Sequence, residues 1–242
     1  MRMLIISDIH ANLTAFEAVL ADAEGEWDII WCLGDLVGYG PKPNECVALL
    51  REHNHISLSG NHDWAVLGKL DIQTFNNEAR AAIEWTREQI SNETKTYLRS
   101  LPPTLVQDDF TLAHASPRQP VWEYILDQYT ASINFGFFDT PYCLVGHTHV
   151  PVRFEEEDTH TITPHLPDYD NCIQLNHTRL IINPGSVGQP RDSDPRAAYA
   201  LLDIETKQWF YRRAYYPVHR TQEQMRLHNM PMRLIRRLEH GW

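Results

Sequence analysis

The sequence predicts an α/β fold built on two β-sheets with covering helices, and three observations support this prediction. Over the first 60 residues, short apolar runs typical of strands alternate with segments of helical periodicity. After residue 104, strand signals recur with hairpin-like breaks, which suggests a second sheet packed on the first. The 242 residues are 43% hydrophobic and 22% charged, an ordinary globular composition, and we expect a single domain over residues 1–242.

The first part of the chain has the order strand, helix, strand, helix, strand. Apolar runs predict the strands over 3–7, 29–33 and 56–59. Helical spacing predicts one helix that begins after Asn12, a candidate N-cap, and a second that ends near Glu52. This order implies a mostly parallel sheet, in which ligands gather at the carboxyl ends of the strands.

The remaining elements follow from the same patterns. Residues 64–100 are predicted to be mostly helical, over 79–90 and 93–100, with Ser91 as a cap between the two helices. Strands are predicted over 105–107, 110–114, 142–145, 150–154, 179–183, 198–203 and 208–213. The stretch 219–238 predicts one C-terminal amphipathic helix docked on the body, with a partner-binding helix as the alternative. Its apolar residues lie among five arginines and are Leu227, Met230, Leu234, Ile235 and Leu238.

Composition argues against several classes of protein. The 32 acidic and 21 basic residues give a net charge of -11, which argues against nucleic acid as a partner. The apolar N-terminal stretch ends at Asp8 and is too short for a signal peptide. No run approaches the ~20 apolar residues of a membrane helix. The four widely spaced cysteines predict buried free thiols in a reducing compartment, and they are Cys32, Cys46, Cys143 and Cys172. We therefore expect a cytoplasmic protein with no membrane contact.

Five short patches of metal-binding residue types recur along the chain. They are Asp8-Ile9-His10, Gly34-Asp35, Gly60-Asn61-His62-Asp63, His114 and Gly146-His147-Thr148-His149. Aspartate, histidine and asparagine are ligands for borderline or hard divalent metals. Only five of the 13 histidines belong to these patches, and we expect the others, among them His160, His165 and His177, on the surface or in loops. Since most patches follow strand-like runs, they predict a two-metal site where loops leave a sheet.

The patches resemble the signature of the calcineurin-like metallophosphoesterases. Asn183-Pro184-Gly185-Ser186 resembles a loop near the metals in the smaller bacterial and archaeal phosphodiesterase-like members. The resemblance implies a four-layer α-β-β-α sandwich of two mixed sheets flanked by helices. It also implies two divalent or trivalent metal ions, and the ligand set is compatible with Mn, Fe, Zn, Ni or Co. By this resemblance Asp8, His10 and His149 hold the first metal, Asn61, His114 and His147 hold the second, and Asp35 bridges both.

Spacing and charge agree with these implied ligands. Two histidines lie two positions apart in Gly146-His147-Thr148-His149, so in an extended segment they would project from one face. The glycines at 34, 60 and 146 are expected to allow sharp turns or close backbone approach. Two divalent cations against two carboxylates leave a charge of about +2, which attracts a phosphate and acidifies a shared water. The implied reaction is attack on phosphorus by a metal-bridging hydroxide.

His62 lies next to a predicted ligand but is not assigned as one. By resemblance it is catalytic, either donating a proton to the leaving alkoxide or stabilising the transition state, and a structural role is the alternative. Asp63 is expected to orient the His62 imidazole. Ser186 is expected to shape its loop rather than act as a nucleophile, because no general base is placed beside it.

Three further residues are candidates for substrate binding. Asn12 could contact a phosphate oxygen or act only as a helix cap. Tyr39 could border the substrate pocket or pack within a turn. Arg191 is a candidate phosphate clamp, with pairing to Asp192 or Asp194 as the alternative.

The leading interpretation is a binuclear-metal-dependent phosphoesterase that hydrolyses phosphodiesters or small nucleotide and phosphate esters. One alternative is a phosphomonoesterase or protein phosphatase. A non-catalytic interaction scaffold is a second, and the complete ligand set argues against it. A DNA-repair-like nuclease is a third, and the acidic charge argues against it. The expected partner is a small phosphate-ester substrate, and the sequence carries no signal for an oligomeric state.

Overall fold

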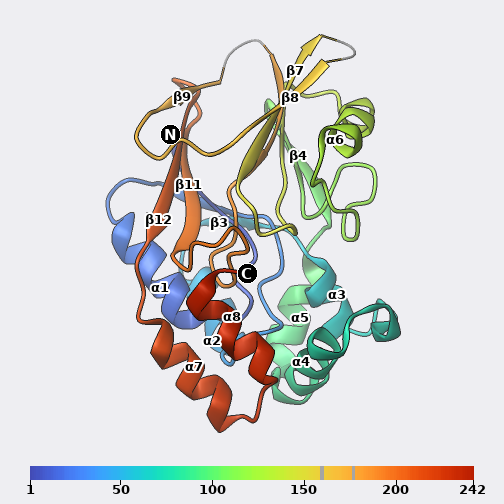
Figure 1. The fold of residues 1–242 in the computed structure, drawn as a ribbon, viewed down its shortest axis with the longest axis vertical. Helices are drawn as coiled ribbons and strands as arrows, with labels where there is room; N and C mark the ends of the chain where they lie inside the picture. Colours follow the sequence, from blue (N-terminus) through green and yellow to red (C-terminus); the bar gives the residue numbers. More distant parts are fainter. Residues whose placement is uncertain (159–160, 176–177) are drawn as a thin grey trace.

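Two six-stranded sheets pack face to face in the computed structural model, which describes residues 1–158, 161–175 and 178–242 (Figure 1). The first sheet has the order β3 (His55–Ser57), β2 (Ile29–Cys32), β1 (Arg2–Ile6), β11 (Ala197–Asp203), β12 (Gln208–Ala214), β9 (Ile173–Gln174). The second has the order β4 (Thr104–Gln107), β5 (Phe110–Ala113), β6 (Tyr142–Leu144), β10 (Arg179–Asn183), β7 (Val152–Asp158), β8 (Thr161–His165). Helices flank both sheets, so the predicted four-layer sandwich is confirmed.

Each sheet contains a parallel core with antiparallel neighbours. In the first sheet, β1, β2 and β3 are parallel, as predicted, and β1 pairs antiparallel with β11. In the second sheet, β5, β6 and β10 are parallel, and β10 pairs antiparallel with β7. Because parallel strands end at one edge of a sheet, the loops after β1, β2, β5 and β6 can converge.

The strand β1 shows how the layers form. Its residues alternate between two cores, since successive side chains of a strand point to opposite faces. Leu4 and Ile6 pack against helices, while Met3 and Ile5 pack into the space between the two sheets. The helices on the outer face of the first sheet are α1 (Leu13–Asp22), α2 (Pro43–Arg51), α4 (Asn77–Gln89) and α5 (Asn92–Ser100). On the second sheet, α6 (Gln128–Asn134) and η2 (Phe135–Phe137) cover the outer face.

The predicted helical segment 64–100 is confirmed and begins slightly earlier than expected. It consists of α3 (Asn61–Val66), η1 (Ile72–Thr74), α4 and α5. Ser91 caps α5 as predicted, because its hydroxyl oxygen accepts a hydrogen bond from the Thr94 N–H at 3.0 Å.

The prediction of one C-terminal helix over 219–238 is wrong. Two helices occupy this region, α7 (Val218–Leu227) and α8 (Met232–His240). The chain turns at Asn229, whose φ is +54°, and Pro231 caps the start of the second helix. Proline has no backbone N–H, so a continuous helix through residue 231 would lack one hydrogen bond. The pair packs on α4 through a core that includes Ala82, Met225 and Leu234, in agreement with their arrangement in Figure 1.

Smaller corrections concern single residues and short strands. Leu227 is exposed rather than on the docked face. His165 lies in β8, a strand that the sequence did not predict, and is 3.2 Å from a carboxylate oxygen of Glu155. His160 and His177 lie outside the described residues.

The expectation for the cysteines is confirmed in part. Within the described ranges, all four cysteines are free and three of them are buried, but Cys172 is exposed. Burial raises the pKa of the Cys32 thiol to about 12, so this thiol is uncharged at neutral pH. No helix of the described chain is both long enough and apolar enough to cross a membrane.

Candidate functional site

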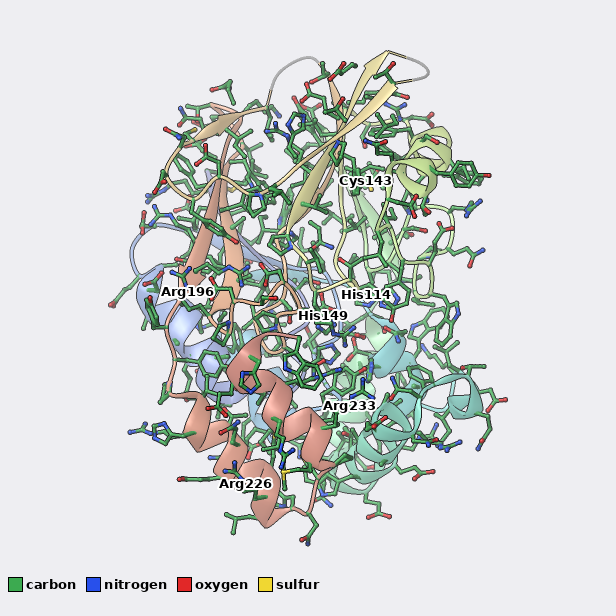
Figure 2. The ribbon with its side chains drawn as sticks, viewed as in Figure 1. His114, Cys143, His149, Arg196, Arg226 and Arg233 are labelled. Carbon is green, nitrogen blue, oxygen red and sulfur yellow. The ribbon has the colours of Figure 1, made fainter. Side chains whose placement is uncertain are left out.

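The seven predicted metal ligands meet at the carboxyl ends of the parallel strands. Asp8 and His10 follow β1, Asp35 follows β2, Asn61 begins α3 after β3, His114 follows β5, and His147 and His149 follow β6. All seven are buried. The labelled His114 and His149 lie near the middle of the molecule in Figure 2, above helix α8 in this view. We call this group of seven side chains the cage.

One half of the cage consists of Asp8, His10 and His149. The Nε2 atoms of the two histidines are 3.1 Å apart, and His149 Nε2 is 3.3 Å from Asp8 Oδ1. Among the described residues, Asp8 Oδ1 is buried without a hydrogen-bond partner. A buried, unpaired carboxylate oxygen is costly unless a cation or donor satisfies it. Ligand distances of about 2.0–2.2 Å around one metal are compatible with these separations.

The other half of the cage consists of Asn61, His114 and His147. His114 Nε2 lies 3.2 Å from Asn61 Oδ1. The ligand atoms of His114, His147 and Asp35 all lie within 4.8 Å of one another. His147 Nε2 is buried and has no hydrogen-bond partner in the described part of the chain, as expected of a nitrogen that faces a metal.

Asp35 joins the two halves. Its Oδ2 atom is 3.5 Å from His10 Nε2 and 3.5 Å from His114 Nε2. Its Oδ1 atom accepts a hydrogen bond from the backbone N–H of His62 at 2.8 Å, which fixes the carboxylate. The carboxylate therefore has the position that a bridging ligand requires.

Backbone carbonyls orient three of the histidine rings. The Nδ1 atoms lie 3.2 Å from Val37 O in His10, 2.9 Å from Leu33 O in His114, and 2.6 Å from Gln189 O in His149. A carbonyl can only accept, so each Nδ1 carries a hydrogen and each Nε2 is the ring nitrogen that faces the cage. Metal-binding histidines commonly donate their other ring N–H in this way.

Comparison with known proteins identifies the family. The sequence model of the calcineurin-like phosphoesterase superfamily domain matches residues 1–207. The chain belongs to the calcineurin-like phosphoesterase superfamily. The predicted resemblance is thus confirmed, and with it membership of a metal-dependent family of phosphoester hydrolases.

Several known proteins are similar to this chain over nearly its full length. An uncharacterized protein of Methanocaldococcus jannaschii is 38% identical over 98% of this chain and 97% of its own length. The crystal structure of a metallophosphoesterase from Sphaerobacter thermophilus is 49% identical, with a TM-score of 0.92 and coverage of 100% and 99%. A hypothetical protein from Pyrococcus horikoshii shares the fold, with a TM-score of 0.81, 20% identity and coverage of 100% and 98%.

Most of the cage residues have an uncommon backbone conformation. Five of the seven have positive φ: Asp8 (53°), His10 (48°), Asp35 (53°), His147 (63°) and His149 (61°). Positive φ is uncommon outside glycine, and such residues cluster at functional sites. The expectation that residues 146–149 are extended is therefore wrong. Thr148 N–H donates to Gly146 O at 2.7 Å, which closes a three-residue turn at His147, and this turn brings both histidines to the cage.

The loop after β10 braces two of the ligand loops. The Ser186 hydroxyl donates to the Asp8 carbonyl at 2.8 Å and accepts from the Gln189 N–H at 2.8 Å. The Asn183 amide donates to the Gly146 carbonyl at 2.7 Å. Ser186 thus shapes its loop, as predicted.

Gly60 lies so close to Asp35 that a side chain at this position would displace the carboxylate. An added Cβ would be 2.0 Å from Asp35 Oδ1 and 2.6 Å from Asp35 N. We expect Gly60→Ala to weaken metal binding by about 10–100-fold, as loss of a group that positions a ligand does. Calorimetric titration with Mn²⁺ measures this change. Gly136→Ala, with nothing within 4 Å of the new Cβ, is the matched control, and equal affinities in the two variants would contradict the prediction.

The charges inside the cage depend on burial and on neighbouring groups. Burial raises the pKa of Asp8 to about 7 and lowers the pKa of His147 to about 3. Burial alone would lower the pKa of His114, but the Asp35 carboxylate outweighs it and raises the pKa to about 9. His114 and His62 in turn hold the pKa of Asp35 below its usual range, against the effect of burial. Because metal ligands must be deprotonated, metal uptake requires His114 to release its proton.

His62 borders the cage, but Asp63 does not orient it. A ring nitrogen of His62 lies within 4.8 Å of ligand atoms of His10 and Asp35. The Asp63 carboxylate instead accepts from the backbone N–H groups of Gly60 at 2.9 Å and Val37 at 3.2 Å. His62 Nδ1 has no hydrogen-bond partner among the described residues, so the expected Asp63–His62 contact is wrong. Asp63 instead ties the α3 N-terminus to the loop after β2.

Asn12 is engaged within the protein. Its Oδ1 atom accepts from the Ala15 N–H at 3.3 Å, which confirms the predicted helix cap, and from the Thr221 hydroxyl at 2.9 Å. Its amide donates to Gly188 O at 2.9 Å and to the Tyr216 hydroxyl at 3.3 Å. The alternative that Asn12 contacts a phosphate stays a prediction, and these bonds occupy the groups it would use.

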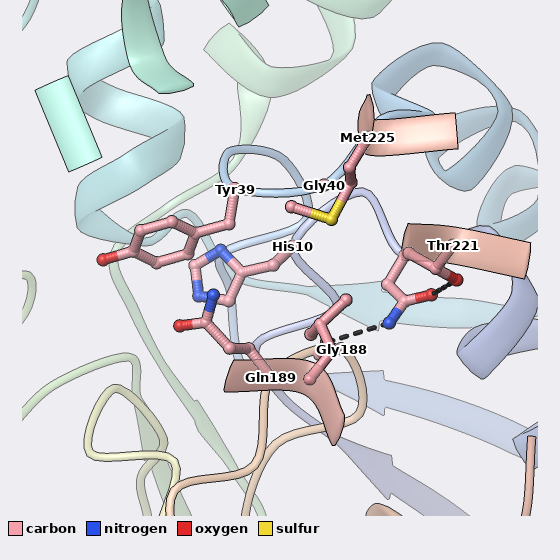
Figure 3. A pocket seen from close by; sticks show the side chains of 9 residues that line it. His10, Tyr39, Gly40, Gly188, Gln189, Thr221 and Met225 are labelled. Carbon is pink, nitrogen blue, oxygen red and sulfur yellow. Dashed lines mark hydrogen bonds between the residues drawn. The ribbon is translucent and has the colours of Figure 1, made fainter. Parts of the chain in front are cut away.

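Tyr39 lies directly against the cage. Its ring centroid is 4.3 Å from that of His62 and 4.6 Å from that of His10. A small cavity of about 10 Å³ lies beside it, between the cage and helix α7, and Figure 3 shows His10, Tyr39 and Gln189 together at this cavity. Tyr39 therefore borders the site and also occupies a tight turn, with a φ of +54°.

Arg191 does not pair with the neighbouring acids, so that alternative is wrong. Asp192 pairs with Arg213, and Asp194 pairs with Arg196 at 2.6 Å. The Arg191 guanidinium instead donates to Gln189 Oε1 at 2.8 Å and lies over the Tyr39 ring, 5.7 Å from its centroid.

No sequence pattern indicated the aromatic cluster that lies at the site. The Tyr124 ring lies 3.9 Å from that of His147, and Phe75 lies 5.4 Å from His62 and 5.1 Å from Trp122. Tyr124 and Trp122 are partly exposed, at 46% and 39%. These residues come from segments without a motif, and only the fold brings them together, so no local pattern could have identified them.

Proposed function

We propose that this chain is a binuclear-metal-dependent phosphoesterase of the cytoplasm that acts on phosphodiesters or small nucleotide esters. The observation that carries the proposal is the position of Asp35. One of its carboxylate oxygens lies at the same distance, 3.5 Å, from a histidine of each ligand half. A carboxylate shared in this way suits two metal ions about 3.5–4 Å apart.

Side chains of this protein would bind the metal ions, donate a proton and bind the substrate phosphate. Asp8, His10 and His149 would hold one ion, Asn61, His114 and His147 would hold the other, and Asp35 would bridge them. Bound metals would supply an activated water and neutralise charge on the phosphate. His62, on the rim of the cage, would donate a proton to the leaving oxygen. Arg191, over the Tyr39 ring, would bind a phosphate oxygen of the substrate.

The aromatic residues at the rim support a nucleotide or other aromatic ester as substrate. Trp122 and Tyr124 are partly exposed, and Phe75 links Trp122 to His62. Exposed aromatic rings stack on nucleobases and similar rings without selecting one particular base.

The test is turnover of two chromogenic esters by purified protein with added Mn²⁺. We expect release of nitrophenolate from bis(p-nitrophenyl) phosphate, with slower release from p-nitrophenyl phosphate, and loss of both activities with a chelator. Elemental analysis should give two metal ions per chain. Absence of turnover of either ester by protein that holds two metals would overturn the proposal. Faster monoester cleavage would favour the phosphomonoesterase alternative.

A further inference from the structure

Two arginines from distant parts of the chain share one acceptor beside the cage. Arg191 follows the loop after β10, and Arg237 lies on α8, outside the residues that the family model matches. Arg191 Nη2 donates to Gln189 Oε1 at 2.8 Å, and Arg237 Nη1 donates to the same oxygen at 3.0 Å. Gln189 itself is buried. Two cations thus meet at one neutral oxygen.

Neither guanidinium has a carboxylate partner in the described part of the chain. Other arginines of this region do: Arg196 pairs with Asp194, Arg213 with Asp192 and Arg233 with Glu78. The Nε atoms of Arg191 and Arg237 are both buried and have no hydrogen-bond partner among the described residues. Since buried donors are normally satisfied, each guanidinium keeps hydrogen-bonding capacity that the described chain does not use.

The arginine pair is connected directly to the cage. The Arg191 backbone N–H donates to the His149 carbonyl at 3.2 Å, and Gln189 O accepts from His149 Nδ1 at 2.6 Å. The guanidinium of Arg191 lies over Tyr39, whose other neighbours are His10 and His62.

We propose that Arg191 and Arg237, held by Gln189, form a second anion subsite beside the metal cage, so that the preferred substrates carry a second phosphate group. This inference rests on the proposed function and narrows its substrate class to esters or anhydrides with two neighbouring phosphates. One phosphate would occupy the cage and the other would accept from the guanidinium groups. Arginine suits this task because its planar fork matches two phosphate oxygens.

The location of Arg237 agrees with a role in selecting substrates rather than in the reaction itself. It comes from α8, which packs on α4 through Leu234 and Leu238 and has no predicted metal ligand. The chain has a net charge of -11. Two arginines without carboxylate partners, next to a cationic metal site, would nevertheless attract a polyanion locally.

Binding of two hydrolysis-resistant probes tests the subsite without any need for turnover. Calorimetric titration of the Mn²⁺-loaded protein gives a Kd for methylenediphosphonate and a Kd for methylphosphonate. We expect Arg237→Gln to reduce the preference for the two-phosphonate probe by roughly 10- to 100-fold, the effect of one charge-assisted contact. Arg233→Gln is the matched control, because Arg233 lies on the same helix and pairs with Glu78, and it should keep the wild-type preference.

The outcomes separate the inference from its alternatives. If Arg237 only docks α8, Arg237→Gln will lower the Tm and leave the ratio of the two Kd values unchanged, which would overturn the inference. An equal weakening of both probes would also overturn it, since that indicates one phosphate position. If the Arg237→Gln variant does not fold, the same two Kd values are measured for Arg191→Gln, which removes the other guanidinium and should also reduce the preference for the two-phosphonate probe. Failure to hydrolyse esters would count against the proposed function, whereas this binding ratio would still be measurable.

Discussion

Replacement of Asp35 by asparagine is expected to abolish phosphoesterase activity and to lower the metal content of the protein. The variant keeps the size of the side chain but removes the negative charge that lies 3.5 Å from a histidine in each half of the cage. An amide is a poor bridging ligand, and the charge that favours two cations is lost. We expect activity to fall more than the about 10²–10³-fold that removal of a single transition-state donor costs.

The measurement combines steady-state kinetics on bis(p-nitrophenyl) phosphate with elemental analysis of the dialysed protein. Asp139→Asn, at an exposed position, makes the same chemical change away from the site and should leave both quantities unaltered. If Asp35→Asn retained two metal ions per chain and near-normal activity, Asp35 would not be the bridge between the two halves.

Replacement of His62 by alanine is expected to keep the metals and to lose rate. The backbone N–H of His62, not its ring, holds Asp35 Oδ1 at 2.8 Å, so this contact survives the substitution. Loss of a general acid costs typically 10²–10⁴-fold in rate. The loss should depend on the leaving group, since nitrophenolate departs without a proton and an alkoxide does not. We therefore expect kcat to fall much more for an alkyl ester than for a nitrophenyl ester.

Two further variants serve as controls for the His62→Ala measurement. His62→Asn fills part of the space between Tyr39 and Phe75 and separates lost chemistry from lost packing. His219→Ala, at an exposed histidine, should behave as wild type. Loss of metal from His62→Ala would show that the ring is a ligand, and equal losses for the two kinds of ester would argue against proton donation.

The sequence predicted the cage better than it predicted what surrounds it. The ligands belong to short contiguous patches at strand ends, and strand ends follow from apolar periodicity. Asp63 shows where this reasoning fails. Its neighbour in sequence is His62, yet its carboxylate binds the backbone N–H of Gly60 and that of Val37. Gly60 offers an unpaired donor at the N-terminus of α3, and Val37 offers one in the loop after β2. Adjacency in sequence did not decide between these partners.

The residues around the cage are brought there by tertiary contacts, which no local sequence pattern predicts. Pro231 was visible in the sequence and marked the break between α7 and α8, so that error was avoidable. In contrast, Arg237 is one of five arginines in the C-terminal stretch, and only the docking of α8 selects it. Tyr124 likewise reaches His147 because the loop that carries it folds over the strand ends.

The pairing of β1 with β11 has a consequence for how the protein acquires its activity. Arg2 lies opposite Asp203, so the strand that carries the first ligands along the chain is completed by one synthesised about 200 residues later. Such sequence-distant pairing raises contact order and slows folding, because loop closure must precede the stabilising contacts. On the ribosome, all seven ligands emerge well before β11 does, and the emerging polypeptide therefore carries the ligands before it can hold them in register. The predicted ligands after β1 can therefore reach their final register only once β11 has been synthesised.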